Sequence, residues 1–395
     1  MIYTKTNSRH GYFDLNFFKP LRQAQFENNS VYWYDQHDWA MKNTPFNRFI
    51  DKPHWEHLQR DPTSKILIFY ADEYYNLIDM EDWVTTLKKW NIRSEQVYIL
   101  CLDKNWVKWT KEQFAKRDYN GVNIQDYNLL MHRVEPQKEK PVVKRFSALS
   151  RNYNKWRLGL YAYLFNQRVL TRDFNYTFNN LNPYGKIIVY PKEDVKADLI
   201  SLGFELTPSL EKWVDGMPYS LKNDHIQEKL AEDAYNMIQT SGINVVIESH
   251  VDPFWNFKGH RQLVHPQQFS PSFPTEKMYK PIACKKPFIV FSTPWFLKEF
   301  KTLGYKTFHP YINESYDDIE NDTERLKAIA NEVKRLCDLP QAEFFEVLEK
   351  CKEITEHNFN MMESLKKDVS LKPEFEWIEP YLEKNLPVPG KGGEL

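Results

Sequence analysis

Two kinds of apolar pattern alternate along the first third of the chain. Continuous apolar runs over residues 65–71 and 97–102 are typical of strands in a sheet that is covered on both faces. Between the two runs, Trp83, Leu87 and Trp90 recur at helical spacing. A strand, a helix and a second strand in this order predict a βαβ unit and therefore a parallel sheet.

The same alternation begins again beyond residue 141. It predicts strands over residues 142–149, 244–249 and 287–292. It also predicts helices over residues 153–165, 275–284 and 295–305, and a helical C-terminal region over residues 323–367. The third of these helices should end at Gly304, because glycine adopts a left-handed cap at little cost. Residues 1–64 are rich in aromatic side chains but show no regular pattern, so we expect irregular structure there.

These patterns predict an α/β fold with two domains. The boundaries fall at an N-terminal α/β domain over residues 1–136, a basic hinge over 137–145 and a second α/β domain over 146–368. Residues 369–395 form a C-terminal tail, for which a return to the N-terminal domain is one option.

Composition removes several classes of enzyme. The chain has 395 residues and a formal charge of -1, but only 12 glycines. No G-x-G-x-x-G, Walker loop or G-x-S-x-G elbow occurs, which disfavours phosphate-loop kinases and related enzymes. The four cysteines have no C-x-x-C spacing, no D-x-D or H-E-x-x-H motif occurs, and no apolar run approaches the ~18 residues that span a bilayer. We therefore expect free thiols, no metal, no membrane partner and a cytoplasmic location, in the host cytoplasm if the source is viral.

Candidate chemistry gathers where predicted strands end and helices begin. Arg151 and Arg157 follow one strand, and Glu248 ends the next. Thr275 is a plausible N-cap for a helix whose first turn contains Glu276 and Lys277. A lysine at the positive end of a helix is disfavoured unless an anion compensates it, which indicates a phosphate nearby.

The stretch from residue 137 to residue 157 is basic. It has a single acid, Glu139, and seven basic residues: Lys138, Lys140, Lys144, Arg145, Arg151, Lys155 and Arg157. Such a surplus indicates either a bound polyanion or a solvated linker. For Arg151 and Arg157, which flank a strand end, contact with an anion is the favoured interpretation.

The segment from Phe273 to Ile282, FPTEKMYKPI, followed by KPFIV at Lys286–Val290, resembles the donor-site motif of GT-B glycosyltransferases, in particular fucosyltransferase-like and exostosin-like enzymes. Downstream, the stretches beginning at Trp295 and Leu303, and Asn313–Asp317, are similar to those of viral and bacterial glycosyltransferases. The resemblance covers roughly residues 146–337. It implies a GT-B-like fold, with two Rossmann-like domains facing a central cleft.

The resemblance also implies roles for several residues. Glu276 would hydrogen-bond the ribose or base of a nucleotide-sugar donor, such as a UDP- or GDP-sugar, whose identity stays open. Lys277, with Arg151 or Arg157, would neutralise the departing diphosphate, so that no bound metal is required. For Glu314 and Asp317 it suggests either contact with the donor sugar or a structural role.

The catalytic base should come from the first domain. Asp72 and Glu73 directly follow the strand over residues 65–71, where a catalytic carboxylate or an ordinary turn residue would both fit. Glu248 is also well placed, and contact with the donor and a buried pair with Arg151 are alternatives for it.

Two acceptors fit a glycosyltransferase of this composition, which is rich in Asn, Lys, Tyr and Phe and typical of AT-rich viral genomes. One is a hydroxymethylated pyrimidine in double-stranded phage or viral DNA, and the other is a glycan or glycolipid. The basic hinge and the aromatic residues Tyr32, Trp33, Tyr34, Trp39 and Trp55 favour DNA slightly, because they would bind phosphates and hold an extruded base. A non-catalytic protein of the same fold that binds nucleotides or nucleic acid is the alternative of another class.

Overall fold

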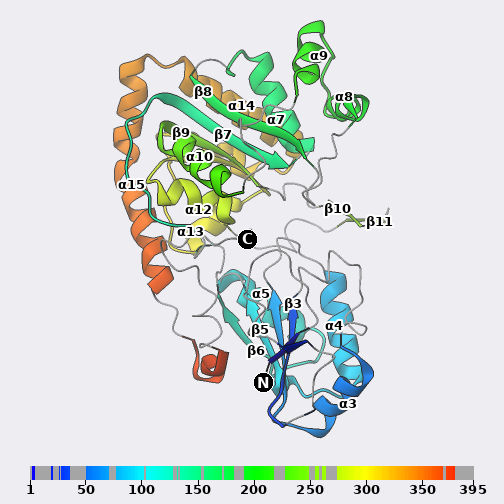
Figure 1. The fold of residues 1–395 in the computed structure, drawn as a ribbon. Coiled ribbons are helices and arrows are strands. Elements are labelled where there is room, and N and C mark those ends of the chain that lie inside the picture. The colour runs from blue at the N-terminus through cyan, green and yellow to red at the C-terminus, as the bar shows by residue number, and fades with distance from the viewer. Residues whose placement is uncertain are drawn as a thin grey trace. The chain divides into compact units, whose positions relative to one another are not determined.

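The computed structural model describes residues 2–4, 19–20, 26, 28–35, 50–70, 77–101, 104–127, 131, 134–152, 155–170, 173–181, 191–217, 227–248, 254–257, 260–263, 274–367 and 371–378. The chain divides into two compact units, and Figure 1 labels elements from both. Unit 1 comprises Met1–Arg133 and Lys366–Leu395, and unit 2 comprises Val134–Leu365.

Unit 1 is built on a parallel sheet of six strands in the order β2-β1-β3-β4-β5-β6. The strands are β1 (Ile2–Thr4), β2 (Lys19–Pro20), β3 (Val31–Asp35), β4 (Lys65–Tyr70), β5 (Val97–Cys101) and β6 (Asn123–Asp126). Its helices are α3 (Lys52–Arg60), α4 (Leu77–Lys89) and α5 (Lys104–Ala115), with a short 3-10 helix η3 (Ser94–Gln96) before β5. The βαβ unit predicted from the alternation of β4, α4 and β5 is therefore confirmed.

The expectation of irregular structure over residues 1–64 was wrong for most of the described residues there, which form β1, β2, β3 and α3. Tyr32, Trp33 and Tyr34 lie in β3, a central strand, and their side chains are buried. Trp55 is buried in α3, while Trp39 lies outside the described residues. Because burial in the core leaves no aromatic face for a base, these four described aromatic residues cannot act as a stacking platform for DNA.

The C-terminal segment that belongs to unit 1 contacts the strands β5 and β6. A 3-10 helix, η5 (Pro373–Ile378), follows Lys372. The backbone N–H of Lys372 donates to Gln125 Oε1 at 3.0 Å, and its ammonium group donates to the carbonyl of Ile124. The ring of Phe375 packs against Tyr98 at 5.3 Å, so the segment extends the apolar core of this sheet.

Unit 2 contains a four-stranded parallel sheet in the order β12-β9-β7-β8. The strands are β7 (Lys144–Asn152), β8 (Phe174–Leu181), β9 (Ser241–Ile247) and β12 (Phe288–Phe291). Both β9 and β12 are buried along their whole length, as expected of strands in a sheet covered on both faces. An antiparallel hairpin, β10 (Phe254–Phe257) and β11 (His260–Leu263), separates β9 from the next helix.

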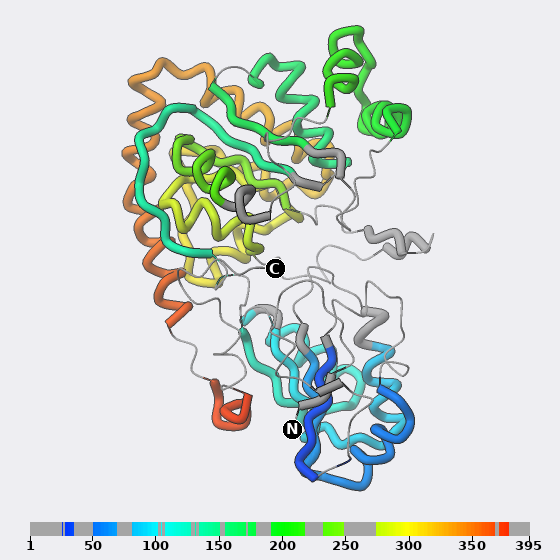
Figure 2. The backbone as a smooth tube through the Cα atoms, viewed as in Figure 1, coloured from blue at the N-terminus to red at the C-terminus, as the bar shows by residue number. Residues whose placement is uncertain are grey.

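Helices account for most of the rest of unit 2, and Figure 2 traces the chain through them by colour. They are α7 (Lys155–Asn166), α8 (Lys192–Ser201), α9 (Pro208–Asp215), α10 (Gln227–Gln239), α12 (Glu276–Ala283), α13 (Phe296–Thr302), the 3-10 helix η4 (Ser315–Asp318), α14 (Asp322–Asp338) and α15 (Gln341–Lys367). Gly304 follows α13 with φ 95, the left-handed conformation predicted for it. Two parallel sheets with a helical C-terminal region confirm the predicted α/β fold class. The central cleft between the domains stays a prediction.

The order of strands in unit 2 reverses between β7 and β9. From β7 the chain passes through α7 to β8 on one side, and later returns to β9 on the other side of β7. The carboxyl ends of parallel strands flank a ligand site where the strand order reverses in this way, because the connections leave the sheet in opposite directions. The fold of unit 2 therefore singles out the carboxyl ends of β7 and β9.

Candidate functional site

A buried carboxylate lies directly after β9. Glu248 is 3% exposed, and the hydroxyl of Thr275 is 2.9 and 2.8 Å from its two carboxylate oxygens. The backbone N–H of Thr275 also donates to Glu248 Oε1 at 3.4 Å. These bonds join residues that are 27 positions apart, and they fasten the start of α12 to the carboxyl end of β9.

Thr275 caps the N-terminus of α12, as predicted. Its backbone is extended, and its hydroxyl oxygen accepts the N–H of Lys277 at 3.2 Å. The hydroxyl thus accepts a hydrogen bond from the first turn of the helix and donates one to the carboxylate of Glu248. The cap positions the first turn of α12 beside the end of β9.

Lys277 brings a positive charge to this first turn. Its ammonium nitrogen is 3.3 Å from Glu276 Oε1, 3.6 Å from Glu248 Oε2 and 3.3 Å from Thr275 Oγ1. The side chain is 21% exposed, so the ammonium group lies between the buried carboxylate and solvent. Two carboxylates of the chain itself compensate a cation at the positive end of the helix.

Arg157 comes from the first turn of α7, on the other side of the point of reversal. Its guanidinium Nη2 donates to the carbonyl of Ile247 at 3.3 Å, and the side chain is 4% exposed. One turn later, the hydroxyl of Tyr161 lies 2.9 Å from the carbonyl oxygen of Ala148 in β7 and 3.1 Å from that of Thr177 in β8. Helix α7 is therefore fixed over the strand ends, with Arg157 at the end of β9 next to Glu248.

The structure thus brings Arg157, Glu248, Thr275, Glu276 and Lys277 to one edge of the sheet of unit 2. Arg151 belongs to β7, but its side chain lies outside the described residues. Asp72 and Glu73, the candidate bases, lie outside the described residues altogether.

Glu314 and Asp317 accept hydrogen bonds from the backbone of neighbouring segments. Asp317 accepts the backbone N–H groups of Leu297 and Lys298, which begin α13. Burial raises the pKa of Asp317 to about 6 even though these bonds lower it. Glu314 accepts the N–H of Phe308, and burial raises its pKa as well. Within the described residues, the contacts of both carboxylates fit the structural alternative.

Part of the basic stretch also serves the fold. Arg145 lies in β7, and its Nη1 donates to the carbonyls of Cys337 and Leu339 at 2.9 and 2.6 Å, at the C-terminal end of α14. Lys140 donates to Asn236 Oδ1 at 3.0 Å. These two charges therefore have partners inside unit 2.

Sequence analysis missed a second buried arginine. The side chain of Arg325 in α14 is almost fully buried, and its guanidinium donates to the carbonyls of Ser292 and Ile319 at 2.9 and 2.6 Å and to the carboxylate of Asp322. It thereby holds the first residue after β12, the neighbour of β9. The one available signal was an arginine directly before Leu326 on the apolar stripe of a predicted helix.

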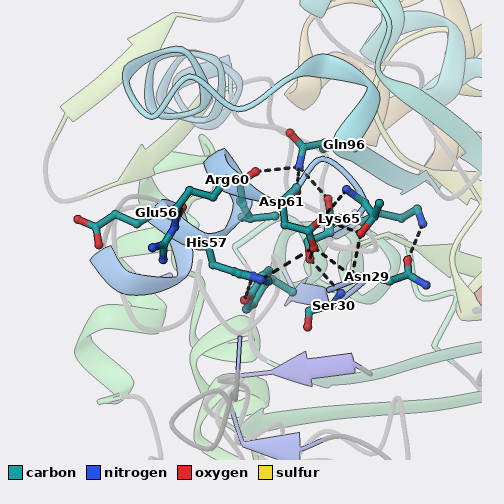
Figure 3. Close-up of polar contacts among 12 residues, drawn as sticks. Asn29, Ser30, Glu56, His57, Arg60, Asp61, Lys65 and Gln96 are labelled. Carbon is teal, nitrogen blue, oxygen red and sulfur yellow. Dashed lines mark hydrogen bonds and ion pairs between the residues drawn. The ribbon is translucent and has the colours of Figure 1, made fainter. Parts of the chain in front are cut away.

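A different polar cluster lies at the amino ends of strands in unit 1 (Figure 3). Asp61 accepts the backbone N–H groups of Asn29 and Thr63 at 3.0 and 2.9 Å, and the hydroxyls of Thr63 and Ser64. Burial alone would raise the pKa of Asp61, but these hydrogen bonds outweigh it and hold the pKa well below its usual range.

Two further side chains complete this Asp61 cluster. The amide of Gln96 donates to the carbonyls of Leu58, Asp61 and Ser64 at 2.8–3.0 Å. His57 Nδ1 is 2.8 Å from the hydroxyl of Tyr32, and His57 Nε2 is 3.9 Å from Asp61. The cluster joins the loops that precede β3, β4 and β5, on the edge of the sheet opposite to the one where α/β folds bind ligands.

Among the residues that the structure describes, no three His, Cys, Asp or Glu side chains are grouped as metal ligands would be. In the same part of the chain, no helix is long and apolar enough to cross a membrane.

No protein-family model matches the sequence, and no curated protein matches it either. The solved structures to which the chain is similar include an α,α-trehalose-phosphate synthase (UDP-forming) from Burkholderia xenovorans in complex with glucose-6-phosphate, at 9% identity over 88% of this chain and 75% of that one, with a TM-score of 0.44. The pneumococcal O-GlcNAc transferase GtfA in complex with UDP and GlcNAc is 11% identical over 88% and 57%, with a TM-score of 0.44. A DNA-modifying β-glucosyltransferase is 13% identical over 90% and 86%, with a TM-score of 0.38. Similarity at this level establishes neither a family nor an activity for the chain.

Proposed function

We propose that the chain is a glycosyltransferase and that unit 2 binds the diphosphate of a nucleotide-sugar donor. The observation that carries this proposal is the position of Lys277 and Arg157. Both belong to the first turn of a helix that begins at the carboxyl edge of the sheet, where the strand order reverses. Helix N-termini and basic side chains at such an edge suit a diphosphate, because both offer positive charge and N–H donors.

Lys277 would exchange partners when the donor binds. Its ammonium group is shared between Glu276 and Glu248, and the partly exposed position leaves it accessible from solvent. A diphosphate at the end of α12 would draw the ammonium group from the carboxylate of Glu276, which could then turn to the ribose or base. Glu248 and Thr275 would keep the helix end in place throughout.

Transfer of the sugar requires stabilisation of the leaving nucleoside diphosphate. Negative charge develops on the diphosphate as the glycosidic bond breaks, and preorganised donors stabilise that charge more than they stabilise the bound donor. We propose that Lys277, Arg157 or Arg151, and the end of α12 supply this stabilisation without a metal ion. Asp72 or Glu73 of unit 1 stays our candidate for the base that deprotonates the acceptor hydroxyl.

The acceptor hydroxyl would belong to one of two classes of molecule. DNA carrying a hydroxymethylated pyrimidine remains our candidate on the composition of the chain, with a glycan or glycolipid as the alternative. Two features that favoured DNA serve the fold instead: the aromatic run is core, and Arg145 binds the end of α14. The proposal therefore depends on the donor site, and the two acceptors are to be distinguished by assay.

The test is turnover of nucleotide sugars. Purified protein should release UDP or GDP from one member of a panel of nucleotide sugars when a hydroxyl acceptor is added, with hydroxymethylcytosine DNA and oligosaccharides as separate arms. Tight binding of a nucleotide without turnover on any acceptor would favour the non-catalytic alternative. If no nucleotide or nucleotide sugar binds at all, the proposal is wrong.

A further inference from the structure

Trp295, the N-cap residue of α13 four residues after the end of β12, has an unusual backbone conformation. Its φ is 61 and its ψ is 16, the left-handed region. A bulky residue rarely adopts this conformation, because its Cβ crowds the backbone, and it persists only where surrounding contacts impose it. Such strain in a turn beside a ligand edge points to a function for the side chain.

Buried groups on both sides of the turn impose this conformation. The backbone carbonyl of Asp317 accepts the N–H of Trp295 at 2.7 Å, and the carboxylate of Asp317 accepts the N–H groups that follow. At the other end, Arg325 donates to the carbonyl of Ser292 at 2.9 Å. The short segment Ser292–Trp295 is thus held at its first and last residues.

Trp295 is a partly exposed residue. Within the described part of the chain, its indole forms no ring contact or hydrogen bond with any other residue. A single exposed aromatic residue needs no explanation by itself. A partly exposed tryptophan that is also held in a strained backbone conformation calls for an explanation.

The turn lies at the edge that carries the candidate donor site. In the pairing of β9 with β12, Ile247 is opposite Phe291, and the N–H of Glu248 donates to the carbonyl of Phe291 at 3.0 Å. Neighbouring strands are about 4.8 Å apart, so the segment that begins at Ser292 leaves the sheet beside Glu248. Trp295 follows three residues later.

Building on the proposed function, we infer that Trp295 stacks on the nucleobase of the donor. The transferred sugar must stay accessible to an acceptor, and the diphosphate has no aromatic face, so the base is the part of the donor that unit 2 can hold against an indole. Stacking tolerates every base, because each has a π face. The strained turn then serves to keep the ring in place before the nucleotide arrives.

The experiment is calorimetric titration of wild type, Trp295→Phe and Trp295→Leu with UDP, GDP and inorganic pyrophosphate. Trp295→Leu should weaken binding of the preferred nucleoside diphosphate about fivefold or more, the usual range for loss of one stacked base. Affinity for pyrophosphate should not change, and Trp295→Phe should retain most of the nucleotide affinity. Quenching of tryptophan fluorescence by the nucleotide should be smaller in Trp295→Phe than in wild type.

Trp295→Gly separates the binding role from a structural one. Glycine adopts the left-handed conformation without strain, so this variant should unfold at a temperature no lower than that of Trp295→Leu while binding the nucleotide equally weakly. If Trp295 mattered only for the fold, the variant that preserves stability would also preserve nucleotide affinity.

Two results would overturn the inference while leaving the proposed function in place. They are unchanged nucleotide affinity in Trp295→Leu and an equal loss of affinity for pyrophosphate. If wild type binds none of the nucleotides, the proposed function fails and this inference fails with it.

Discussion

The two units each contain a buried carboxylate that organises a loop at a strand end, but the two carboxylates have different partners. Asp61, at the amino ends of the strands of unit 1, accepts from neutral backbone N–H and hydroxyl groups. Glu248, at the carboxyl edge of unit 2, accepts from the hydroxyl and the backbone N–H of Thr275 and lies 3.6 Å from the ammonium group of Lys277, whose side chain is partly exposed. The Asp61 cluster lies at the amino ends of its strands, whereas the Glu248 cluster lies at the edge where α/β folds bind ligands and contains a partly exposed cation.

Truncation of Asp61 should have the largest effect on stability. Asp61→Ala leaves the N–H groups and hydroxyls that it binds without their buried acceptor, so we expect a loss of about 3 kcal/mol in the free energy of unfolding. Urea denaturation of wild type and variant measures this loss. Asp61→Asn, which keeps an acceptor oxygen, should lose less, and nucleotide affinity should not change in either variant. A change in affinity would show that the Asp61 cluster is more than structural.

Lys277→Ala should reduce nucleotide affinity, which Asp61→Ala leaves unchanged, and should reduce stability less than Asp61→Ala does. Lys277 is partly exposed but pairs with the buried carboxylate of Glu248, which keeps its hydrogen bonds to Thr275, so we expect a loss of about 1–2 kcal/mol, smaller than that of Asp61→Ala. Affinity for the nucleoside diphosphate should fall about tenfold or more, because a charge-assisted contact to phosphate is lost. Thermal unfolding and titration calorimetry measure the two quantities on the same samples. A large loss of stability with unchanged affinity would show that Lys277, like Asp61, stabilises the fold and does not bind the nucleotide.

Thr275→Val should affect both properties moderately. Valine keeps the shape of threonine but can neither cap α12 nor donate to Glu248, so stability should fall by about 1–2 kcal/mol. Nucleotide affinity should fall as well, because the end of α12 loses its attachment to β9. Thr275→Ser retains the hydroxyl and serves as the matched control. If Val and Ser variants behave alike, the hydrogen bonds of Thr275 do not hold the site together.

The smallest effect is a pH dependence in the Asp61 cluster. Burial lowers the pKa of His57, although the nearby Asp61 opposes this shift. As the pH falls, His57 is therefore protonated at a higher pH in the unfolded chain than in the folded one. The contribution of His57 to stability is lost as the pH falls below about 6.5. His57→Gln should flatten this part of the curve of melting temperature against pH. Asp317, with a pKa of about 6, titrates in the same interval with the opposite sign, so the difference between wild type and variant is the quantity to compare.

Local patterns along the chain predicted the elements that carry the candidate site. The apolar runs gave the strands β4, β5, β9 and β12, and the sequence of Thr275–Lys277 predicted the cap and the first turn of α12. These features depend on neighbouring residues, which is why they can be inferred without a structure. The aromatic run of β3 was misjudged because its polar flanks hide a strand that is buried by the rest of unit 1.

Contacts between distant residues could not be predicted from the same patterns. Glu248 and Thr275 are 27 positions apart, and Arg145 reaches carbonyls more than 190 positions away. In the sequence, a carboxylate or an arginine that binds a ligand cannot be distinguished from one that only makes contacts within the fold. Only the folded arrangement shows that Arg145 binds the end of α14 while Lys277 pairs with Glu248 and Glu276 at the carboxyl edge of the sheet.

The most direct test of the account is titration of wild type, Lys277→Ala and Lys285→Ala with UDP and GDP. Lys285 follows the other end of α12 and pairs with Glu356, so it controls for the loss of a lysine. The account predicts that wild type and Lys285→Ala bind one nucleoside diphosphate equally well and that Lys277→Ala binds it at least about tenfold more weakly. Equal affinity in all three proteins, or no binding in wild type, would contradict it.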